Sequence, residues 1–328
     1  MERITVAVQT SARLHLGFYN FLSDSRVYGS LGVAIKHPEL YLKATLNTKR
    51  EVKASSDYSR LKFIVENVAR KLGVEGYHVV FEKTLPKHVG LGSTTQTYLA
   101  VASAFSKLLG MKVNVRKLAA LFSRGDVSGI GIAAFEKGGF IVDCGRKRPP
   151  KGILKKPERV EDLPPILFRA RIPSSWKFVI IVPSKIRGLS ETEETTILEK
   201  PQKPPKKLQN MLYSLLLNNI IPSILEEDIN VFGKALTKLQ FLVGKYFSKH
   251  QKGIFCCYET EKIIEMFSKL KCKGYGQSSW GPAAYCIVEG YRRATKILLK
   301  TMEHLEFEAS GFITEARNYG AKIITLYS

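Results

Sequence analysis

The sequence predicts an α+β protein of two halves, in each of which strands and helices alternate. Strand-like and helix-like patterns are interleaved on both sides of a long Pro/Lys-rich segment, and 328 residues with 45% hydrophobic side chains suffice for two ordinary cores. No apolar run reaches the roughly 18 residues that a membrane-spanning helix needs. The N-terminus turns polar too early for a secretory signal, so we expect a cytoplasmic protein.

The first half is expected to form a domain of residues 1–172. Its loop after residue 83 leads directly into a helix rich in small residues, and Gly73 is a natural C-cap for the preceding helix. Apolar alternation and helical spacing predict strands at 3–9, 12–17, 32–36, 39–47, 76–83 and 138–145, and helices at 59–73, 93–109 and 114–123.

The second half is expected to form a domain of residues 173–328. Residues 146–166, with their many Pro and Lys residues, are predicted to form the long connection between the halves. Beyond it, the patterns predict a buried strand at 176–183, helices at 207–225, 228–246, 258–270 and 292–302, a strand at 283–290 and short strands near 304–309 and 322–327.

The chain is strongly basic, with 51 Lys and Arg against 29 Asp and Glu, a formal net charge of +22. Such an excess fits either nucleic-acid binding or a pocket for phosphorylated or carboxylated small molecules. Much of it lies in two Pro/Lys stretches, 146–156 and 200–207, that are typical of solvated connectors, and no aromatic-interleaved basic motif of the RNA-binding kind is present. The five scattered cysteines show neither zinc-ligand spacing nor a disulfide framework.

Three segments carry residue types suited to a binding site. The first, PKHVGLGSTTQ (86–96), is a glycine-rich loop between a strand and a helix. Glycines let the backbone approach an anion, and free N–H groups at a helix N-terminus favour phosphate. The spacing matches neither a Walker A nor a dinucleotide fingerprint, so a simple tight turn is the alternative.

The other two segments are less specific. In SARLHLG (11–17), strand alternation would place Ser11, Arg13 and His15 on one face, where they could line a polar pocket or face solvent. GYGQSSWGP (274–282) is rich in Gly and Ser and contains one of two tryptophans. It could surround a ligand with backbone donors or form a loop anchored by a core Trp280.

Taken together, these segments resemble the GHMP superfamily of small-molecule kinases. The phosphate loop of that superfamily matches Gly90–Thr95 and its small-residue helix, and SGIG (128–131) followed by Gly138-Gly139 is similar to its next signature. The resemblance implies an N-terminal domain with a ribosomal-S5-like fold, a ferredoxin-like C-terminal domain and a site between them. The match departs from ordinary kinases at Gly131, where they commonly carry a catalytic Asp, and at Arg13, where they usually carry Lys.

One branch fits these departures, the β-ribofuranosylaminobenzene 5′-phosphate synthases of archaeal methanopterin biosynthesis. Similar segments are SARLHLGF, GSLGVAI, GLGSTTQ, RGDVSGIGIAAFEKGGFIVDCG, RGLSETEE and GQSSWGPAAY, of which the last is the most specific. The resemblance implies decarboxylating transfer of phosphoribose from phosphoribosyl pyrophosphate to 4-aminobenzoate, releasing CO2 and pyrophosphate. It also implies a homodimer, and we expect Mg²⁺ as the cofactor.

The resemblance suggests binding roles but no catalytic residue. We expect the loop to hold the diphosphate, the N-terminal strand to form a wall and the second domain to close the pocket. The residues in these three roles are Gly90, Leu91, Gly92, Ser93, Thr94 and Thr95; Ser11, Arg13 and His15; and Gln277, Ser278, Ser279 and Trp280. Trp280 could stack on the ring or be structural.

Charged candidates remain unranked. Arg26, Arg124 and Arg187 could hold a carboxylate or 5′-phosphate, and Asp126, Glu191 and Glu194 could hold Mg²⁺, with no ligand set chosen. The alternative is an ATP-dependent GHMP kinase for a small alcohol or acid, with Asp126 as base. A nucleic-acid-binding protein ranks third and would show steeply salt-dependent binding.

Overall fold

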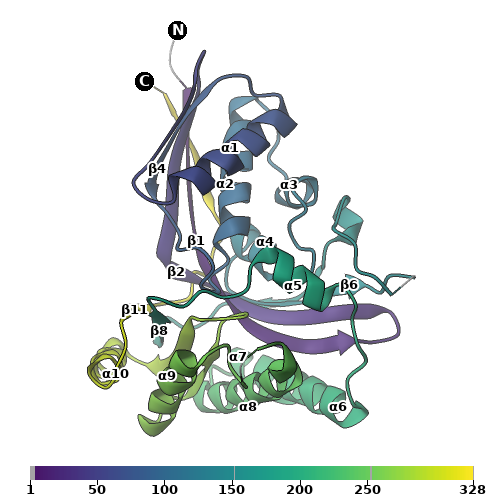
Figure 1. The fold of residues 1–328 in the computed structure, drawn as a ribbon, viewed down its shortest axis with the longest axis vertical. Helices are drawn as coiled ribbons and strands as arrows, with labels where there is room; N and C mark the ends of the chain where they lie inside the picture. The colour runs from purple at the N-terminus through teal and green to yellow at the C-terminus, as the bar shows by residue number, and fades with distance from the viewer. Residues whose placement is uncertain (1–3, 151, 252, 328) are drawn as a thin grey trace.

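The computed structural model describes residues 4–150, 152–251 and 253–327. Two antiparallel-rich sheets dominate it, and both chain ends lie at the same end of the molecule (Figure 1). The strands of the first sheet are β1 (Ile4–Leu22), β2 (Arg26–Leu46), β3 (Arg50–Ala54), β4 (Tyr77–Lys83), β5 (Phe140–Asp143), β6 (Arg146–Lys147), β7 (Ile166–Ala170) and β12 (Lys322–Tyr327). Those of the second are β8 (Trp176–Pro183), β9 (Gly274–Gln277), β10 (Ala284–Glu289) and β11 (Ala309–Thr314).

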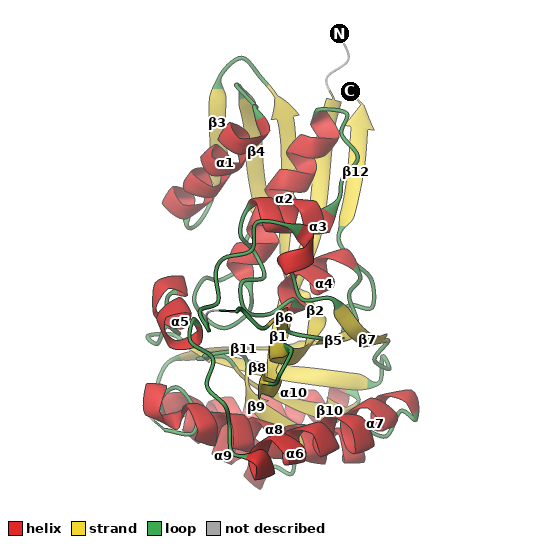
Figure 2. Ribbon diagram, turned by 90° about the vertical axis from the view of Figure 1, so that its right-hand side faces the viewer, coloured by secondary structure: helices red, strands yellow, loops and turns green. Residues whose placement is uncertain are grey.

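The helices are distributed over both halves, as an α+β fold requires. Those of the first half are α1 (Tyr58–Leu72), α2 (Ser93–Leu108), α3 (Val115–Leu121) and α4 (Ile130–Glu136). Those of the second are α5 (Glu191–Leu198), α6 (Lys206–Leu215), α7 (Ile221–Leu225), α8 (Ile229–Phe247), α9 (Tyr258–Lys269) and α10 (Tyr291–Glu303), with a π-helical stretch, Leu216–Ile220, joining α6 to α7. In Figure 2, α5 lies at the junction of the two halves, above α6, α8 and α9.

The long hairpin of β1 and β2 connects the halves. Four separate strands were predicted there, but the structure has two, whose register shifts between Ser11 and Arg13, between His15 and Gly17 and between Phe18 and Asn20. These irregularities bend the ladder without ending it. The C-terminal strand β12 returns to pair with β1, so residues 322–327 belong to the first sheet although they follow the second.

The second sheet is buried on both faces, which explains the near-continuous apolar pattern of β8. Phe178 and Ile180 pack in the main core that also contains α8, whereas Val179 and Ile181 pack in a separate core with α9. Each residue of the strand therefore meets an apolar layer.

Two sequence expectations need correction. The stretch 146–156 is not simply solvated: Arg146 is buried and donates to the carbonyls of Asp126, Lys155 and Asp162 at 2.6–2.8 Å. Those three bonds compensate the burial of its charge. The short strand near 304–309 lies later, as β11, because α10 continues to Glu303 and a turn follows. The stretch 200–207 is largely exposed, as predicted.

Helix length and polarity exclude a membrane-spanning helix over the described residues. In the same part of the chain, no cluster of three or more His, Cys, Asp or Glu side chains could hold a metal ion.

Candidate active site

The three segments singled out in the sequence meet between the two halves. Ser278, fully buried, joins them: its hydroxyl donates to the Gly90 carbonyl at 2.7 Å and accepts from the His15 N–H at 3.0 Å. The Ser279 N–H donates to the His15 carbonyl at 3.1 Å, and the Arg13 N–H donates to the Leu91 carbonyl at 3.2 Å. The glycine-rich loop, the first strand and the second-domain loop therefore form one connected structure.

A polar cavity lies over the glycine-rich loop, with an open volume of about 1050 Å³. We call it the phosphate cavity. Its walls come from both halves, and its lining includes Arg13, His15, Phe18, His88, Gly90–Thr95, Arg124–Ser128, Gly131, Gly188, Leu189, Glu194, Thr195 and Ser279–Gly281.

The N-terminus of α2 forms the floor of this cavity. Gly92 precedes the helix with φ +76°, and the helix has no acidic residue in its first turn. Gly90 also has a positive φ, and a Cβ there would lie 2.2 Å from the Ser278 carbonyl oxygen, so only glycine fits under the second-domain loop. The free N–H groups and the helix dipole give this floor a positive potential.

Arg13 places a positive charge beside that floor. Its Nη1 donates to the Gly90 carbonyl at 2.6 Å, and within the described residues its buried Nε has no hydrogen-bond partner. Burial lowers the pKa of Arg13 to about 10, and the nearby Glu194 partly opposes this effect. A desolvated guanidinium with an unpaired N–H at the cavity wall is well placed to bind an anion.

His15 lies where the phosphate cavity meets a second one. Burial, followed by the charge of Arg13, lowers its pKa to about 3, so the imidazole is neutral at physiological pH. Its Nδ1 accepts the Gly17 N–H at 3.4 Å, which leaves the proton on Nε2. His15 can therefore donate a hydrogen bond in the site but does not supply a positive charge.

The second cavity, the aromatic cavity, has an open volume of about 460 Å³. It shares His15, Phe18, Ser279 and Trp280 with the phosphate cavity, so the two are adjoining compartments. The remaining lining comes from β1, α8, the segment after α8 and the second-domain loop: Gly17, Gln240, Val243, Gly244, Phe247, Gln251, Ile254, Phe255 and Gln277.

Asp143, at the end of β5, holds in place the loop that carries Ser128, a lining residue of the phosphate cavity. Its buried carboxylate accepts from the N–H groups of Ser30, Gly129 and Gly145 at 2.8–3.1 Å and from the Ser30 hydroxyl at 2.7 Å. The Ser128 hydroxyl, which lines the cavity, lies 2.7 Å from that of Ser30. Burial raises the pKa of Asp143 to about 6 despite these hydrogen bonds.

Most of the expected site residues come together. Gly90–Thr95, Arg13, His15, Gln277, Ser279 and Trp280 line one or both cavities, whereas Ser278 is the buried link described above. Ser11 and Arg26 are not among the lining residues. Ser11 is separated from Arg13 by a register shift, which breaks the expected alternation, and Arg26 donates to the Gly145 carbonyl at 3.3 Å.

Some of the unranked charged candidates line a cavity and others do not. Arg124, Asp126 and Glu194 line the phosphate cavity, whereas Arg187 donates to backbone carbonyls of its own loop, those of Ser184 and Ile186. The Glu191 side chain lies outside the described part of the chain.

Sequence reasoning missed Asp143 and Phe247, the aromatic residue that α8 contributes to the aromatic cavity. The only signal for Asp143 was a single carboxylate in the otherwise apolar strand GGFIVDCG. Phe247 could not be distinguished from an ordinary core residue of an amphipathic helix.

Comparison with known proteins shows which family the chain resembles. Residues 59–139 match the family described as the GHMP kinases N terminal domain. The chain is 30% identical over 298 residues to the β-ribofuranosylphenol 5′-phosphate synthase of Methanothermobacter thermautotrophicus, covering 87% of this chain and 89% of that protein. It is 29% identical to the Archaeoglobus fulgidus protein of the same name, covering 96% and 98%.

The chain belongs to the β-ribofuranosylphenol 5′-phosphate synthase family. This is the synthase branch expected from the sequence, under its alternate name, and the resemblance to a synthase rather than an ordinary kinase is thereby confirmed.

Solved structures confirm the fold of this synthase family member. Homoserine kinase from Cytophaga hutchinsonii superimposes with a TM-score of 0.69 at 17% identity, covering 98% of this chain and 97% of that one. Mevalonate diphosphate decarboxylase from Staphylococcus aureus gives 0.66 at 13% identity, covering 99% and 98%. The expected α+β GHMP fold is therefore present over the whole chain.

Proposed function

We propose that this enzyme transfers phosphoribose from phosphoribosyl pyrophosphate to a 4-substituted benzoate, with loss of CO2 and pyrophosphate. The observation that carries the proposal is the pairing of two cavities, one built for a polyanion and the other lined by aromatic side chains, on either side of His15 and Trp280. The product would serve methanopterin-type cofactor biosynthesis.

The chemistry asks the phosphate cavity to stabilise a leaving group. The bond from the anomeric carbon to the diphosphate oxygen breaks through an oxocarbenium-like transition state, and the electron pair leaves with pyrophosphate. The N–H groups at the start of α2 and the Arg13 guanidinium can receive the developing charge by preorganised electrostatics.

No base is needed to activate the acceptor. The ring carbon that bears the carboxylate forms the new C–C bond, and the pair from the broken C–CO2 bond restores aromaticity. Gly131 therefore fits the proposal where kinases commonly need an Asp. A Cβ added at Gly131 would lie 3.2 Å from Cγ2 of Thr95 in the glycine-rich loop. An acidic side chain at this position would therefore bring negative charge toward the diphosphate.

The para substituent of the acceptor is either an amino or a hydroxyl group. 4-Aminobenzoate is the acceptor that the sequence resemblance implies, whereas the name of the relatives describes a product that carries a hydroxyl. Both groups donate electrons to the ring and would support attack from the opposite carbon.

We include Mg²⁺ as part of the proposal. Asp126 and Glu194 both line the phosphate cavity, and Mg²⁺ in proteins is commonly held by one or two carboxylates together with substrate phosphates. These two residues therefore fit the role of holding it, and the ion would neutralise charge on the departing diphosphate. Homodimer formation and a cytoplasmic location stay predictions, the first testable by light scattering.

A paired assay tests the function. One arm supplies phosphoribosyl pyrophosphate, Mg²⁺ and carboxyl-labelled 4-hydroxybenzoate or 4-aminobenzoate, and traps CO2. The other supplies ATP with small alcohols and acids and follows ADP, because Asp126 lines the cavity and keeps a kinase as the rival. We expect CO2 that depends on both substrates, without ADP. ADP without CO2 would overturn the proposal, and salt-sensitive nucleic-acid binding alone would favour the third hypothesis.

A further inference from the structure

The aromatic cavity has a polarity gradient that the proposed reaction does not by itself require. We call its junction with the phosphate cavity, at the four lining residues that the two cavities share, its mouth. Beyond the mouth, Arg13 and Arg124 line the phosphate cavity. None of the aromatic cavity's own described lining residues carries a formal charge at neutral pH, because His15 is held neutral. An ionic group of a ligand is therefore favoured at the mouth, and a neutral group in the interior.

Glutamine side chains provide the polar groups of this uncharged cavity. The Gln277 side chain accepts from the Cys256 N–H at 2.8 Å and donates to the Ser279 carbonyl at 3.0 Å and to Gln251 Oε1 at 3.4 Å. Gln251 in turn donates to the Ile254 carbonyl at 2.6 Å. Among the described residues, Gln251 Oε1 accepts this one long bond, and a carbonyl oxygen with two lone pairs has capacity for a further donor.

Aromatic and aliphatic side chains form the remaining walls. Phe247 lies against both Phe18 and Trp280, with ring centroids 6.0 Å and 5.0 Å away. Helix α8 approaches β1 closely at Gly17, where an added Cβ would lie 2.9 Å from the Leu239 side chain, and Val243 lies in ordinary contact beside it. A planar ring between such walls buries its faces and leaves its two ends to the polar regions.

We propose that the aromatic cavity is the acceptor subsite, and that Gln251 reads the para hydroxyl or amino group of the benzoate. This inference rests on the proposed function. The carboxylate-bearing carbon must face the anomeric carbon over the phosphate cavity, so the para group, at the opposite end of the ring, points inward. Its O–H or N–H donates to Gln251 Oε1.

Calorimetry of the full-length protein separates this subsite from the phosphate cavity. Three ligands are titrated: pyrophosphate, 4-hydroxybenzoate and unsubstituted benzoate, the two benzoates in the presence of pyrophosphate and Mg²⁺. Val243→Phe fills the aromatic cavity without touching the phosphate cavity, and Val231→Phe, the same change at an exposed position of α8, is its matched control.

For the filled cavity we expect the Kd of 4-hydroxybenzoate to rise roughly tenfold or more, as overpacking costs imply. The Kd of pyrophosphate should stay within about twofold, as it should for every ligand in the control variant. Unchanged 4-hydroxybenzoate binding by a folded Val243→Phe protein would place the acceptor elsewhere and overturn the inference.

Gln251→Leu tests the para contact. The wild-type protein should prefer 4-hydroxybenzoate over benzoate by roughly fivefold, the value of about one neutral hydrogen bond. The variant should lose this preference, with benzoate affinity nearly unchanged. A merely structural role would weaken both ligands equally, and that result would also overturn the assignment.

Different experimental results would contradict this inference and the proposed function. If the wild-type protein releases CO2 but the variants bind the acceptor normally, only the subsite is wrong. If the wild-type protein binds pyrophosphate but neither binds a benzoate nor releases CO2, both are wrong.

Discussion

Arg13 is the residue on which we expect anion binding at the proposed site to depend most. Replacing this guanidinium with Gln removes the charge and the donor to Gly90. We expect kcat/KM for phosphoribosyl pyrophosphate to fall roughly 10²- to 10³-fold, as for other preorganised transition-state donors. Arg13→Lys should recover part of the loss, since it restores charge but not the planar fork. Steady-state kinetics with each substrate varied would measure this.

The control for this experiment is Arg292→Gln, at an exposed position on α10 outside both cavities. Its kinetics should match the wild-type protein. If Arg13→Gln loses stability but keeps its kinetic constants, the guanidinium is structural and does not bind the diphosphate.

Ser278 is expected to contribute to stability, because its hydroxyl links the first strand to the glycine-rich loop. In the Ser278→Ala protein the buried N–H of His15 loses its acceptor and the Gly90 carbonyl loses one donor. We expect the free energy of unfolding to fall by about 1–3 kcal/mol, the cost of a buried unsatisfied group. Urea unfolding measures it, with Ser310→Ala, an exposed position on β11, as the unchanged control. Equal stability of both variants would show that the three segments do not depend on this hydroxyl.

At the scale of elements, the loop before α4 depends on a carboxylate at the end of β5. Burial raises the pKa of Asp143 to about 6, above its value in the unfolded chain, so the folded protein binds the extra proton between about pH 4 and pH 6. The contribution of a group with a raised pKa is complete at low pH and declines as the pH rises through the folded value. Stability from this residue should therefore decrease from pH 4 to pH 7.

Asp143→Asn removes this titration and places an amide NH2 beside backbone donors. The variant should be less stable by about 1–3 kcal/mol at pH 4.5, and the difference from the wild-type protein should shrink by pH 7.5. Denaturant unfolding at both pH values measures the difference. A gap that stays constant with pH would mean that the carboxyl does not titrate in this range.

The sequence predicted these elements unequally, for physical reasons. Helices with strong amphipathic spacing, such as α1 and α8, match within one or two residues. The short elements α4 and β9 were not predicted, because tertiary hydrogen bonds such as those from Gln96 to the Gly131 carbonyl and from the Tyr275 N–H to Thr237 help to hold them. Helix α5 was not predicted either, although its contacts are local. The capping box of α5, in which Ser190 and Glu193 satisfy each other's backbone N–H, was nevertheless readable in the sequence.

The same distinction holds for the site. The phosphate loop could be predicted, because glycines and a helix start are local features, and Arg13 and His15 followed from strand alternation. The aromatic cavity could not be predicted, because Phe18 and Phe247 are 229 positions apart in the sequence and meet only when α8 packs on β1. Ser11 was predicted to line the site by strand alternation, but a register shift between Ser11 and Arg13 interrupts that alternation.

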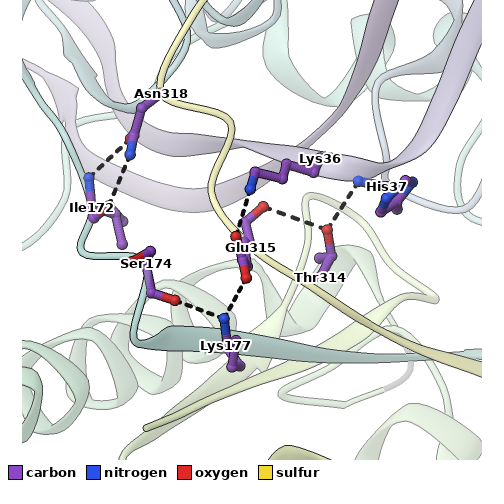
Figure 3. Close-up of polar contacts among 8 residues, drawn as sticks. All are labelled: Lys36, His37, Ile172, Ser174, Lys177, Thr314, Glu315 and Asn318. Carbon is purple, nitrogen blue, oxygen red and sulfur yellow. Dashed lines mark hydrogen bonds and ion pairs between the residues drawn. The ribbon is translucent and has the colours of Figure 1, made fainter. Parts of the chain in front are cut away.

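At the scale of the whole molecule, an ion-pair cluster ties the two halves together away from the site. Glu315 follows β11, and its carboxylate pairs with Lys36 of β2, at 2.6 Å, and with Lys177 of β8 (Figure 3). Asn318, nearby, accepts from the Ile172 N–H at 3.0 Å and donates to the Ile172 carbonyl at 2.9 Å. Since both cavities draw walls from both halves, this cluster helps to fix the relative position of those walls.

Glu315→Gln should reveal how much this junction contributes. Two lysines pair with one partly buried carboxylate, so we expect a loss of about 1 kcal/mol at low salt that largely disappears in 1 M NaCl. Lys177 and Lys36 hold the pKa of Glu315 below its usual value. The stabilisation is therefore present above the unfolded pKa of a glutamate and is lost as the pH falls through the lower folded value.

A matched variant separates this cluster from ordinary surface pairs. Glu308 also follows the turn after α10, but its pair with Lys185, at 3.6 Å, is largely exposed, so Glu308→Gln should change stability by no measurable amount. Thermal unfolding at two salt concentrations compares the two variants. If both behave alike, the halves are held by their shared apolar core alone. If only Glu315→Gln responds to salt and also raises the KM of both substrates, the ion pairs maintain the geometry of the site from a distance.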